Sequence, residues 1–254
     1  MRIVSWNING IRAAAKKGLG KFMKQDGADI FCFQEVKAKA EQVPMGSNFP
    51  SDYYSYWNPA DKPGYSGVAT YSRIEPKVII NGMDRQEFDK EGRVLATKFA
   101  EFTLLNVYFP NGKSGRERLF YKMDFYDYFL KFINKLRDSG EKIVFLGDVN
   151  TAHREIDLAR PKENENVSGF LPEERRWIDK VVGEGYVDTF RELHGGQEKY
   201  TWWSQRSKAR IRNVGWRIDY VFVDKSLMPK VKEAFILDAV EGSDHCPIGI
   251  EIEF

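Results

Sequence analysis

Seven short runs of mainly apolar residues are spread along the whole chain, and they restrict its fold more than any other feature. Short runs of this kind, with many β-branched and aromatic side chains, are typical of buried β-strands. They are RIVSW (2–6), DIFCF (29–33), SGVATYS (66–72), TLLNVYF (103–109), KIVFLG (142–147), IDYVFV (218–223) and CPIGIEIEF (246–254). Because buried strands must be covered by other elements, the chain has to place these runs in sheets packed against further structure.

Three segments between these runs have the pattern of helices. Residues 114–138 show the strongest pattern, with apolar residues at near-helical spacing and a stop at Ser139-Gly140. Residues 172–183 carry Pro172 in the first turn, and residues 12–25 form a helix that two glycines weaken. Strands and helices therefore alternate, which predicts an α/β fold. We expect residues 1–254 to form a single domain.

Composition excludes several classes of protein. The chain has 254 residues, 42% of them hydrophobic and 30% charged, which is typical of a globular domain. The net charge of +2 does not by itself point to a polyanionic partner. Cys32 and Cys246 are too few and too far apart for a disulfide framework, so we expect a reducing environment. The chain shows no signal-peptide pattern and no membrane span, so we expect an intracellular protein. We also expect it to be a monomer.

Polar residues adjoin five of the apolar runs at one end. They are Asn7 and Asn9, Gln34 and Glu35, Tyr108 and Asn111, Asp148 and Asn150, and Asp244 and His245. Turns favour Asn and Asp, which explains any single case. Strand ends are also where a sheet presents rigid polar groups to a cleft. Five runs with mainly acids and amides favour one shared site.

The residue types of this site suggest its chemistry. The set is Asn7, Glu35, Tyr108, Asn111, Asp148, Asn150, Asp219, Asp244 and His245. It has no Cys/His cluster for zinc, and the chain has no Walker lysine loop or dinucleotide loop. Oxygen ligands suit a hard divalent ion, Mg²⁺ or Mn²⁺, and a His beside an Asp can donate a proton to a phosphoryl oxygen. The set predicts metal-assisted attack of water on a phosphate ester, with a structural salt-bridge network as the alternative.

Residues 200–220 combine aromatic and basic side chains. Trp202, Trp203 and Trp216 lie among Lys and Arg residues in this stretch. Aromatic faces suit a sugar or a base, and cations suit backbone phosphates. Four cations are expected to set the affinity for backbone phosphates and its salt dependence: Arg206, Lys208, Arg210 and Arg212. Trp203 is expected to pack in a core, and a second basic stretch from Arg12 to Lys24 is a weaker candidate for backbone contacts.

The chain resembles the exonuclease III family of abasic-site (AP) endonucleases. The matching stretches are SWNINGIRA (5–13), DIFCFQEVK (29–37), GYSGVATYS (64–72), NVYFPNG (106–112), FLGDVNTAHREIDL (145–158), GFLPEERRW (169–177), NVGWRIDYVFV (213–223) and GSDHCPI (242–248). They span the chain in the family's order. The resemblance implies a four-layer sandwich, in which two packed β-sheets are flanked by helices and the site lies at one rim.

The resemblance also implies a role for each site residue. The metal ligands would be Asn7, Glu35 and, through water, Asp244. The catalytic residues would be Tyr108, Asp148, Asn150, Asp219 and His245, with His245 held by Asp219. The substrate-binding residues would include Asn111 at the phosphate and Trp202, Trp216 and Ile218 around an extruded deoxyribose. Whether Asp148 is the general base stays open. His153 is expected to have no catalytic role, and His194 is expected to lie in a loop.

Three positions depart from the family's pattern. Trp202 stands where Phe is commoner, Asn9 stands where some members have Asp, and Ser114 stands where some members insert an Arg. Lys113 or Arg116 are candidates to replace that Arg. These departures leave the shape of the sugar pocket and the distortion of the DNA open.

The resemblance implies a DNA repair enzyme that acts on double-stranded DNA. It would hydrolyse the phosphodiester bond 5′ to an abasic site and leave a 3′-OH. A 3′→5′ exonuclease, 3′-end cleaning and incision at other damaged nucleotides are further activities to expect. A phosphoesterase of the same fold that acts on RNA or on a phosphorylated small molecule is the alternative. A DNA-binding module without catalysis is a third possibility, which the presence of the main site residues disfavours.

Overall fold

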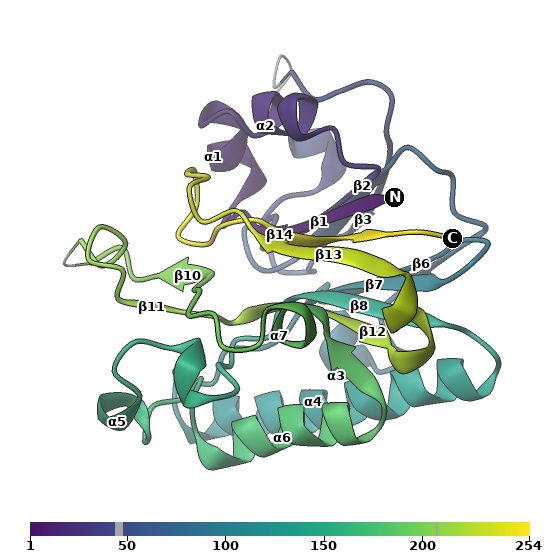
Figure 1. Ribbon diagram of the computed structural model, residues 1–254. Helices are drawn as coiled ribbons and strands as arrows, with labels where there is room; N and C mark the ends of the chain where they lie inside the picture. Colours follow the sequence, from purple (N-terminus) through teal and green to yellow (C-terminus); the bar gives the residue numbers. More distant parts are fainter. Residues whose placement is uncertain (44–47, 207) are drawn as a thin grey trace.

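The computed structural model describes residues 1–43, 48–206 and 208–254, and it contains two six-stranded β-sheets packed face to face with helices outside them (Figure 1). The first sheet has the order β13 (Val231–Ile236), β14 (Ile248–Ile252), β1 (Arg2–Asn7), β2 (Ile30–Gln34), β4 (Val68–Ser72) and β3 (Tyr54–Asn58). The second has the order β5 (Val78–Asn81), β6 (Val94–Lys98), β7 (Thr103–Tyr108), β8 (Ile143–Asp148), β12 (Asp219–Asp224) and β9 (Tyr186–Asp188). The expected fold of two packed sheets flanked by helices is confirmed.

Helices cover the outer face of each sheet. In Figure 1, α1 and α2 lie on the side of the first sheet, and α4 and α6 lie on the side of the second. The helices are α1 (Ile11–Lys16), α2 (Leu19–Asp26), α3 (Gln86–Asp89), α4 (Arg116–Asp138), α5 (Pro161–Asn164), α6 (Pro172–Gly183) and α7 (Thr189–His194). Short 3₁₀ turns occupy Ala40–Gln42, Glu155–Asp157 and Lys225–Lys230.

The predicted helices need one correction. The segments 114–138 and 172–183 form α4 and α6 as predicted, with α4 beginning at Arg116. The single helix predicted over 12–25 is wrong, because the chain forms two helices there. Gly18 separates them with a φ of 98°, a left-handed conformation that glycine adopts without the steric cost of a side chain.

Apolar side chains fill three spaces between the four layers. The space between the sheets holds one cluster, which includes Ile3, Leu104, Val144 and Ile250. The aromatic residues of α4 and α6 form a second cluster against the second sheet, and α1 and α2 close a third over the first sheet. Burial of these side chains is the main source of stability. The four-layer arrangement leaves the strand ends free to form a site.

A polar bridge crosses the apolar space between the sheets. Gln34 at the end of β2 donates from Nε2 to Oδ1 of Asn106 in β7, with 2.8 Å between the atoms. Asn106 in turn donates from Nδ2 to the main-chain oxygen of Ala69 at 2.9 Å. Both amides are completely buried, so these bonds fix how the two sheets face each other. The carboxyl ends of β2 and β7 are thereby held at one rim.

A two-stranded arm stands at the same rim. It consists of β10 (Trp202–Trp203) and β11 (Gly215–Trp216), drawn in green at the left of Figure 1. Isolated bridges tie it to the rest of the fold, pairing Trp202 with His245 and Leu158 with Trp216. The arm therefore brings the aromatic stretch next to the polar strand ends.

Two expectations about the whole chain can be compared with the structure. Cys32 and Cys246 are both free and buried, as expected from their number and spacing. Among residues 1–43, 48–206 and 208–254, no helix combines the length and the apolar composition that crossing a membrane requires.

Candidate active site

Strand pairing aligns three of the predicted residues across the second sheet. Tyr108 at the end of β7 pairs with Asp148 at the end of β8, and Asp148 pairs with Asp219 at the start of β12. Asn7 ends β1 of the facing sheet. Since β7 and β8 run parallel and β12 runs antiparallel to them, the register alone brings these side chains to the same rim.

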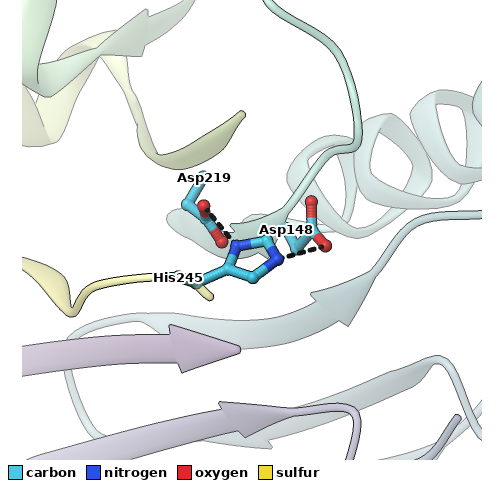
Figure 2. Close-up of side chains that lie close together, drawn as sticks. All are labelled: Asp148, Asp219 and His245. Carbon is cyan, nitrogen blue, oxygen red and sulfur yellow. Dashed lines mark hydrogen bonds and ion pairs between the residues drawn. The ribbon is translucent and has the colours of Figure 1, made fainter. Parts of the chain in front are cut away.

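Asp148, His245 and Asp219 form a buried cluster (Figure 2). His245 Nδ1 lies 2.9 Å from Asp219 Oδ2, and its Nε2 lies 3.8 Å from Asp148 Oδ2. Burial alone would lower the pKa of His245, but the carboxylates of Asp219 and Asp148 outweigh it and raise that pKa to about 10. Burial, with repulsion from Asp219 and Glu35, raises the pKa of Asp148 to about 7 despite the attraction of His245. The cluster is therefore suited to hold and move protons near neutral pH.

Asn150 fixes the carboxylate of Asp148. The turn after β8 places Asn150 at a φ of 57°, and its main-chain N–H donates to Asp148 Oδ1 at 2.8 Å. Asn111 Nδ2 donates to Asn150 Oδ1 at 3.0 Å, which brings the loop after β7 into the same network. Asp148 thus has one oxygen held by the turn and a second that faces Asn7 and His245.

A buried ion pair supports this turn from behind. Lys122 of α4 lies 2.6 Å from Oε1 of Glu174 of α6, and both side chains are completely buried. Lys122 also donates to the main-chain oxygen of Asn150 at 2.8 Å. Our sequence analysis missed this pair, because neither residue lies at a strand end and 52 residues separate them. The pair joins the two outer helices to the catalytic turn.

Glu35 and Asn7 come together across the first sheet. Asn7 donates from Nδ2 to Glu35 Oε1 and to Asp148 Oδ2, at 2.9 Å in both cases. The Asn7 oxygen accepts the main-chain N–H of Asn9 at 3.1 Å. Asn7 therefore orients the two carboxylates, and its expected contact with a metal ion stays a prediction.

Lys37 places a positive charge against Glu35. Its Nζ lies 2.7 Å from Glu35 Oε2 and 2.5 Å from the side-chain oxygen of Asn9. Burial would raise the pKa of Glu35, but Lys37 and the hydrogen bond from Asn7 lower it on balance. The Glu35 carboxylate is thus ionised and already paired with a cation.

Asp244 belongs to the same surface of the site. Its Oδ1 accepts from Asn9 Nδ2 at 2.9 Å, and its Oδ2 accepts from the indole Nε1 of Trp202 at 3.1 Å. Burial would raise the pKa of Asp244, but His245 and these donors lower it on balance. Asp244 is thus an ionised carboxylate with a donor on each oxygen, as Glu35 is, and its water-mediated contribution to a metal site stays a prediction.

Two places offer oxygen ligands to a metal ion. Ligand atoms of Asp148, Asp219 and His245 lie within 4.8 Å of one another. The raised pKa of His245 keeps this imidazole protonated, so it is a poor ligand near neutral pH. Glu35 fits better, because its ionised carboxylate lies at the pocket and Lys37 already marks the place of a positive charge beside it. One or two carboxylates completed by water and phosphate suit a small hard cation.

A pocket of about 280 Å³ opens beside these groups. Its lining residues are Glu35, Tyr108, Asn111, Lys113, Asp148, Asn150, Gly169, Trp202, Trp216, Ile218, Asp244 and His245. The Trp202 and Trp216 rings lie edge to face, with 6.4 Å between their centroids, and Ile218 is buried beside them. The predicted sugar-binding residues and all the predicted catalytic residues except Asp219 therefore line one cavity, and Asp219 reaches it through its hydrogen bond to His245.

Tyr108 is held by a buried arginine that the sequence did not reveal. Arg93 donates to the main-chain oxygen of Tyr108 at 2.8 Å, and its guanidinium lies 4.6 Å from the Tyr108 ring centroid. Glu91 pairs with Arg93 and with Arg118 of α4. Burial and the negative charge of Glu35 raise the pKa of Tyr108 well above its usual value, so its hydroxyl keeps its proton.

The four cations predicted to bind DNA fall into two groups. Arg206, Lys208 and Arg212 are exposed, as a backbone contact requires. Arg210 is different, because its Nη2 donates to the main-chain oxygens of Asp238 and Val240, at 2.8 and 2.6 Å. Its guanidinium also lies 4.7 Å from the ring centroid of Trp203. Arg210 therefore braces the arm in this conformation, and its expected contact with the DNA backbone stays a prediction.

Three other predictions have clear outcomes. Trp203 is buried, as expected. His153 is also buried, and its ring contacts Asp179 at 2.8 Å away from the pocket lining. The loop position predicted for His194 is wrong, because this residue ends α7 and its ring hydrogen-bonds the main-chain oxygen of Ala234.

Fold and site together define a class of protein: a metal-dependent enzyme that hydrolyses phosphate esters and is built on two packed β-sheets with helices outside them. Residues 4–245 match the Endonuclease/Exonuclease/phosphatase family, and the chain belongs to this family. It is 42% identical over 254 residues to an exodeoxyribonuclease of Bacillus subtilis, with 99% of each chain covered. It is 39% identical over 251 residues to a DNA repair nuclease of Danio rerio, with 98% of this chain and 81% of that one covered.

Solved structures agree with this assignment. The structure of an AP endonuclease from Archaeoglobus fulgidus is 27% identical in sequence and matches with a TM-score of 0.91, covering 100% of both chains. The family and the fold inferred from the sequence motifs are therefore confirmed.

Proposed function

We propose that this protein is a DNA repair endonuclease that hydrolyses the phosphodiester bond 5′ to an abasic site in duplex DNA and leaves a 3′-OH. One observation carries the proposal: Asp148 and His245, which Asp219 holds at Nδ1, line the same cavity as the aromatic pair Trp202 and Trp216. The cluster suits phosphate hydrolysis, and the aromatic pair suits an extruded sugar without a base. The relatives named for exodeoxyribonuclease and DNA repair activity support the same substrate class.

Each group of the cluster has a role in this reaction. Asp148 accepts a proton from the attacking water, for which a pKa of about 7 is suitable. His245 stays protonated and donates from Nε2 to a phosphoryl oxygen, while Asp219 holds its Nδ1. Asn150 fixes the angle of the Asp148 carboxylate. Proton transfer and stabilisation of the phosphorane-like charge thus come from groups held in place before the substrate binds.

Other residues of the pocket would bind the phosphate and a metal ion. Tyr108 and Asn111 line the cavity and would donate to the scissile phosphate. Glu35 would hold a divalent ion, Mg²⁺ or Mn²⁺, with Asp244 acting through water. When bound, such an ion neutralises negative charge on the scissile phosphate. Asn7 holds the Glu35 carboxylate in place by donating to its Oε1.

DNA is expected to lie across the rim and the two-stranded arm. Arg206, Lys208 and Arg212 supply exposed cations for the phosphates on either side of the lesion. Lys17 and Lys208 also line an open groove of about 740 Å³ that meets the sugar pocket at Asp244. We further propose that residues 1–254 act as one catalytic domain and as a monomer inside the cell, with 3′→5′ exonuclease and 3′-end-cleaning activity at the same site.

The test is incision of a labelled duplex that carries a single synthetic abasic site, with Mg²⁺ and with EDTA. The expected result is one cut 5′ to the lesion that EDTA abolishes. A single-stranded RNA and a phosphorylated small molecule serve as alternative substrates in parallel reactions. Faster hydrolysis of either would transfer the assignment to a phosphoesterase of the same fold, and activity that persists in EDTA would contradict the metal requirement.

A further inference from the structure

One lysine of the sugar pocket has no part in the proposed hydrolysis. Lys113 follows Asn111 in the loop between β7 and α4, and its main-chain N–H donates to Asn111 Oδ1 at 2.8 Å. Its Nζ lies 5.0 Å from the ring centroid of Trp202 and 5.3 Å from that of Trp216. The amine therefore lies against both aromatic walls, where the proposed function places an abasic sugar.

The surroundings of Lys113 differ from those of two other lysines near the site, Lys37 and Lys122. Lys37 is paired with Glu35, and Lys122 is paired with Glu174, so both amines are held by carboxylates. Lys113 contacts aromatic faces instead. Burial lowers the pKa of Lys113, although Asp148 and Glu174 oppose the shift. A larger share of this amine is neutral than for an ordinary surface lysine, and the neutral amine is the nucleophilic form.

An abasic deoxyribose offers such an amine a reaction partner. The sugar is a hemiacetal in equilibrium with an open-chain aldehyde at C1′. The nitrogen lone pair attacks the C1′ carbon and forms a carbinolamine. The C1′ oxygen then leaves as water, both hydrogens of which come in net from the nitrogen, and an imine remains between Nζ and C1′. The reaction needs no oxidant or reductant, and water reverses it.

We propose that Lys113 forms a reversible imine with the C1′ aldehyde of an abasic site bound between Trp202 and Trp216. This inference rests on the proposed function, because it requires the abasic sugar to enter this pocket. The bond would give the protein a covalent hold on the lesion that needs no metal ion. Confinement of amine and aldehyde in one pocket replaces a bimolecular encounter with an intramolecular one.

The test traps the imine by reduction. A duplex with a natural abasic site, made by enzymatic removal of uracil, is incubated with the protein in EDTA and sodium cyanoborohydride. Hydride from the reagent adds to C1′ and a solvent proton adds to nitrogen, which leaves a stable amine linkage visible on a denaturing gel. The wild type is expected to form the adduct, and peptide mass spectrometry is expected to place it on Lys113.

Two variants and a matched control assign the nucleophile. Lys113→Arg keeps a cation in the pocket and cannot form an imine, and Lys113→Met keeps the length of the side chain. Both are expected to slow trapping by about tenfold or more, the scale that loss of a confined nucleophile allows. Lys131→Met changes an exposed lysine on α4 and should trap like the wild type. Trapping of Lys113→Arg at the wild-type rate, or an adduct on another lysine, would overturn the proposal.

A second substrate separates this inference from the proposed function. A duplex with a tetrahydrofuran analogue has the shape of an abasic site and lacks the aldehyde, so it should be cut in Mg²⁺ and never trapped. If the analogue is cut but the natural abasic site is not trapped, the lysine inference fails and the proposed function stands. If the analogue is not cut, the proposed function fails. If the natural abasic site is nevertheless trapped on Lys113, the result supports imine formation without supporting the proposed hydrolysis.

Discussion

The indole N–H of Trp202 donates a hydrogen bond to Oδ2 of Asp244, with 3.1 Å between the two atoms. The other oxygen of Asp244 accepts from Asn9 at 2.9 Å. A wall of the sugar pocket and an acid proposed to assist the metal are therefore parts of one hydrogen-bonded unit. Phe, which the resemblance gives as the commoner residue at position 202, cannot make this bond. Trp202 and Asn9, two departures from the family's pattern, thus meet on one carboxylate.

Trp202→Phe should therefore change two properties at once. A smaller ring reshapes the pocket, so the ratio between abasic and base-bearing substrates should change more than DNA affinity does. The replacement also removes the indole N–H, so Asp244 Oδ2 loses its donor. The metal concentration for half-maximal rate should therefore shift as well. The measurement is incision of abasic, uracil-containing and undamaged duplexes across a metal titration.

Trp57→Phe is the control for this experiment, because Trp57 lies in β3 at the far edge of the first sheet. It should leave both the substrate ratios and the metal titration as in the wild type. Unchanged ratios for Trp202→Phe would show that Trp202 does not shape the pocket.

Glu35→Gln should weaken metal binding. The amide keeps the shape of the side chain but removes the charge that Lys37 now balances. We expect the metal concentration for half-maximal rate to rise by an order of magnitude or more, together with a lower maximal rate. Glu41→Gln, at an exposed glutamate, is the control. An unchanged titration would show that Glu35 is not the ligand, and a requirement for zinc would contradict the choice of Mg²⁺ or Mn²⁺.

Arg210→Ala should change the stability of the fold, whereas Lys208→Ala should change the salt dependence of DNA binding. Arg210 donates to main-chain oxygens and stacks on Trp203, so its loss should lower the free energy of unfolding by about 2 kcal/mol. Lys208 is exposed, so its loss should leave stability unchanged and lower the salt slope of DNA binding by about one. Urea unfolding and binding across salt concentrations measure the two effects. A reduced salt slope with unchanged stability for Arg210→Ala would restore its role as a DNA contact.

Glu91→Gln should destabilise the protein in a pH-dependent way. Burial would raise the pKa of Glu91, but Arg118 and Arg93 lower it to about 2, below its ordinary value of about 4.5. A carboxylate with a lowered pKa stabilises the fold fully above its unfolded pKa, and this stability is lost as the pH falls through the folded pKa. The variant should lose about 1–2 kcal/mol near pH 7, after allowance for solvent screening. The deficit should shrink as the pH falls from about 4.5 toward 2.

Glu87→Gln is the matched control for Glu91→Gln, since Glu87 pairs with Arg85 at an exposed site. Its effect should be small at every pH. Urea unfolding at several pH values measures both variants. An equal deficit near pH 7 and near pH 2 would show that the charge of Glu91 does not stabilise the fold.

Local patterns in the sequence predicted the strand ends and the catalytic residues that follow them. Asp148 and Glu35 directly follow apolar runs, and the structure has β8 and β2 at those places. All seven predicted runs contain or overlap strands. The sequence analysis missed strands in which charged or exposed residues blur the pattern, such as β13 (VKEAFI) and the exposed edge strand β5 (VIIN).

The supporting contacts could not be predicted, because they join residues far apart in the chain. Lys122 and Glu174 are 52 residues apart, and Trp202 and Asp244 are 42 apart. No periodicity or spacing rule links such pairs, and their partners depend on how the layers pack. Arg210 shows the same limit, since its sequence neighbours are basic while its contacts are main-chain oxygens near residue 240.

The central claim is that Asp148 activates the attacking water without being needed for DNA binding. Asp148→Asn keeps the size of the side chain and one oxygen that can accept from the Asn150 main chain, and it removes the charge that accepts a proton. Single-turnover incision of a duplex with one tetrahydrofuran abasic analogue, measured beside the dissociation constant for the same duplex, tests the claim most directly. The account predicts a fall in rate of at least about a hundredfold, with little change in binding. Loss of binding in parallel with rate, or an unchanged rate, would contradict it.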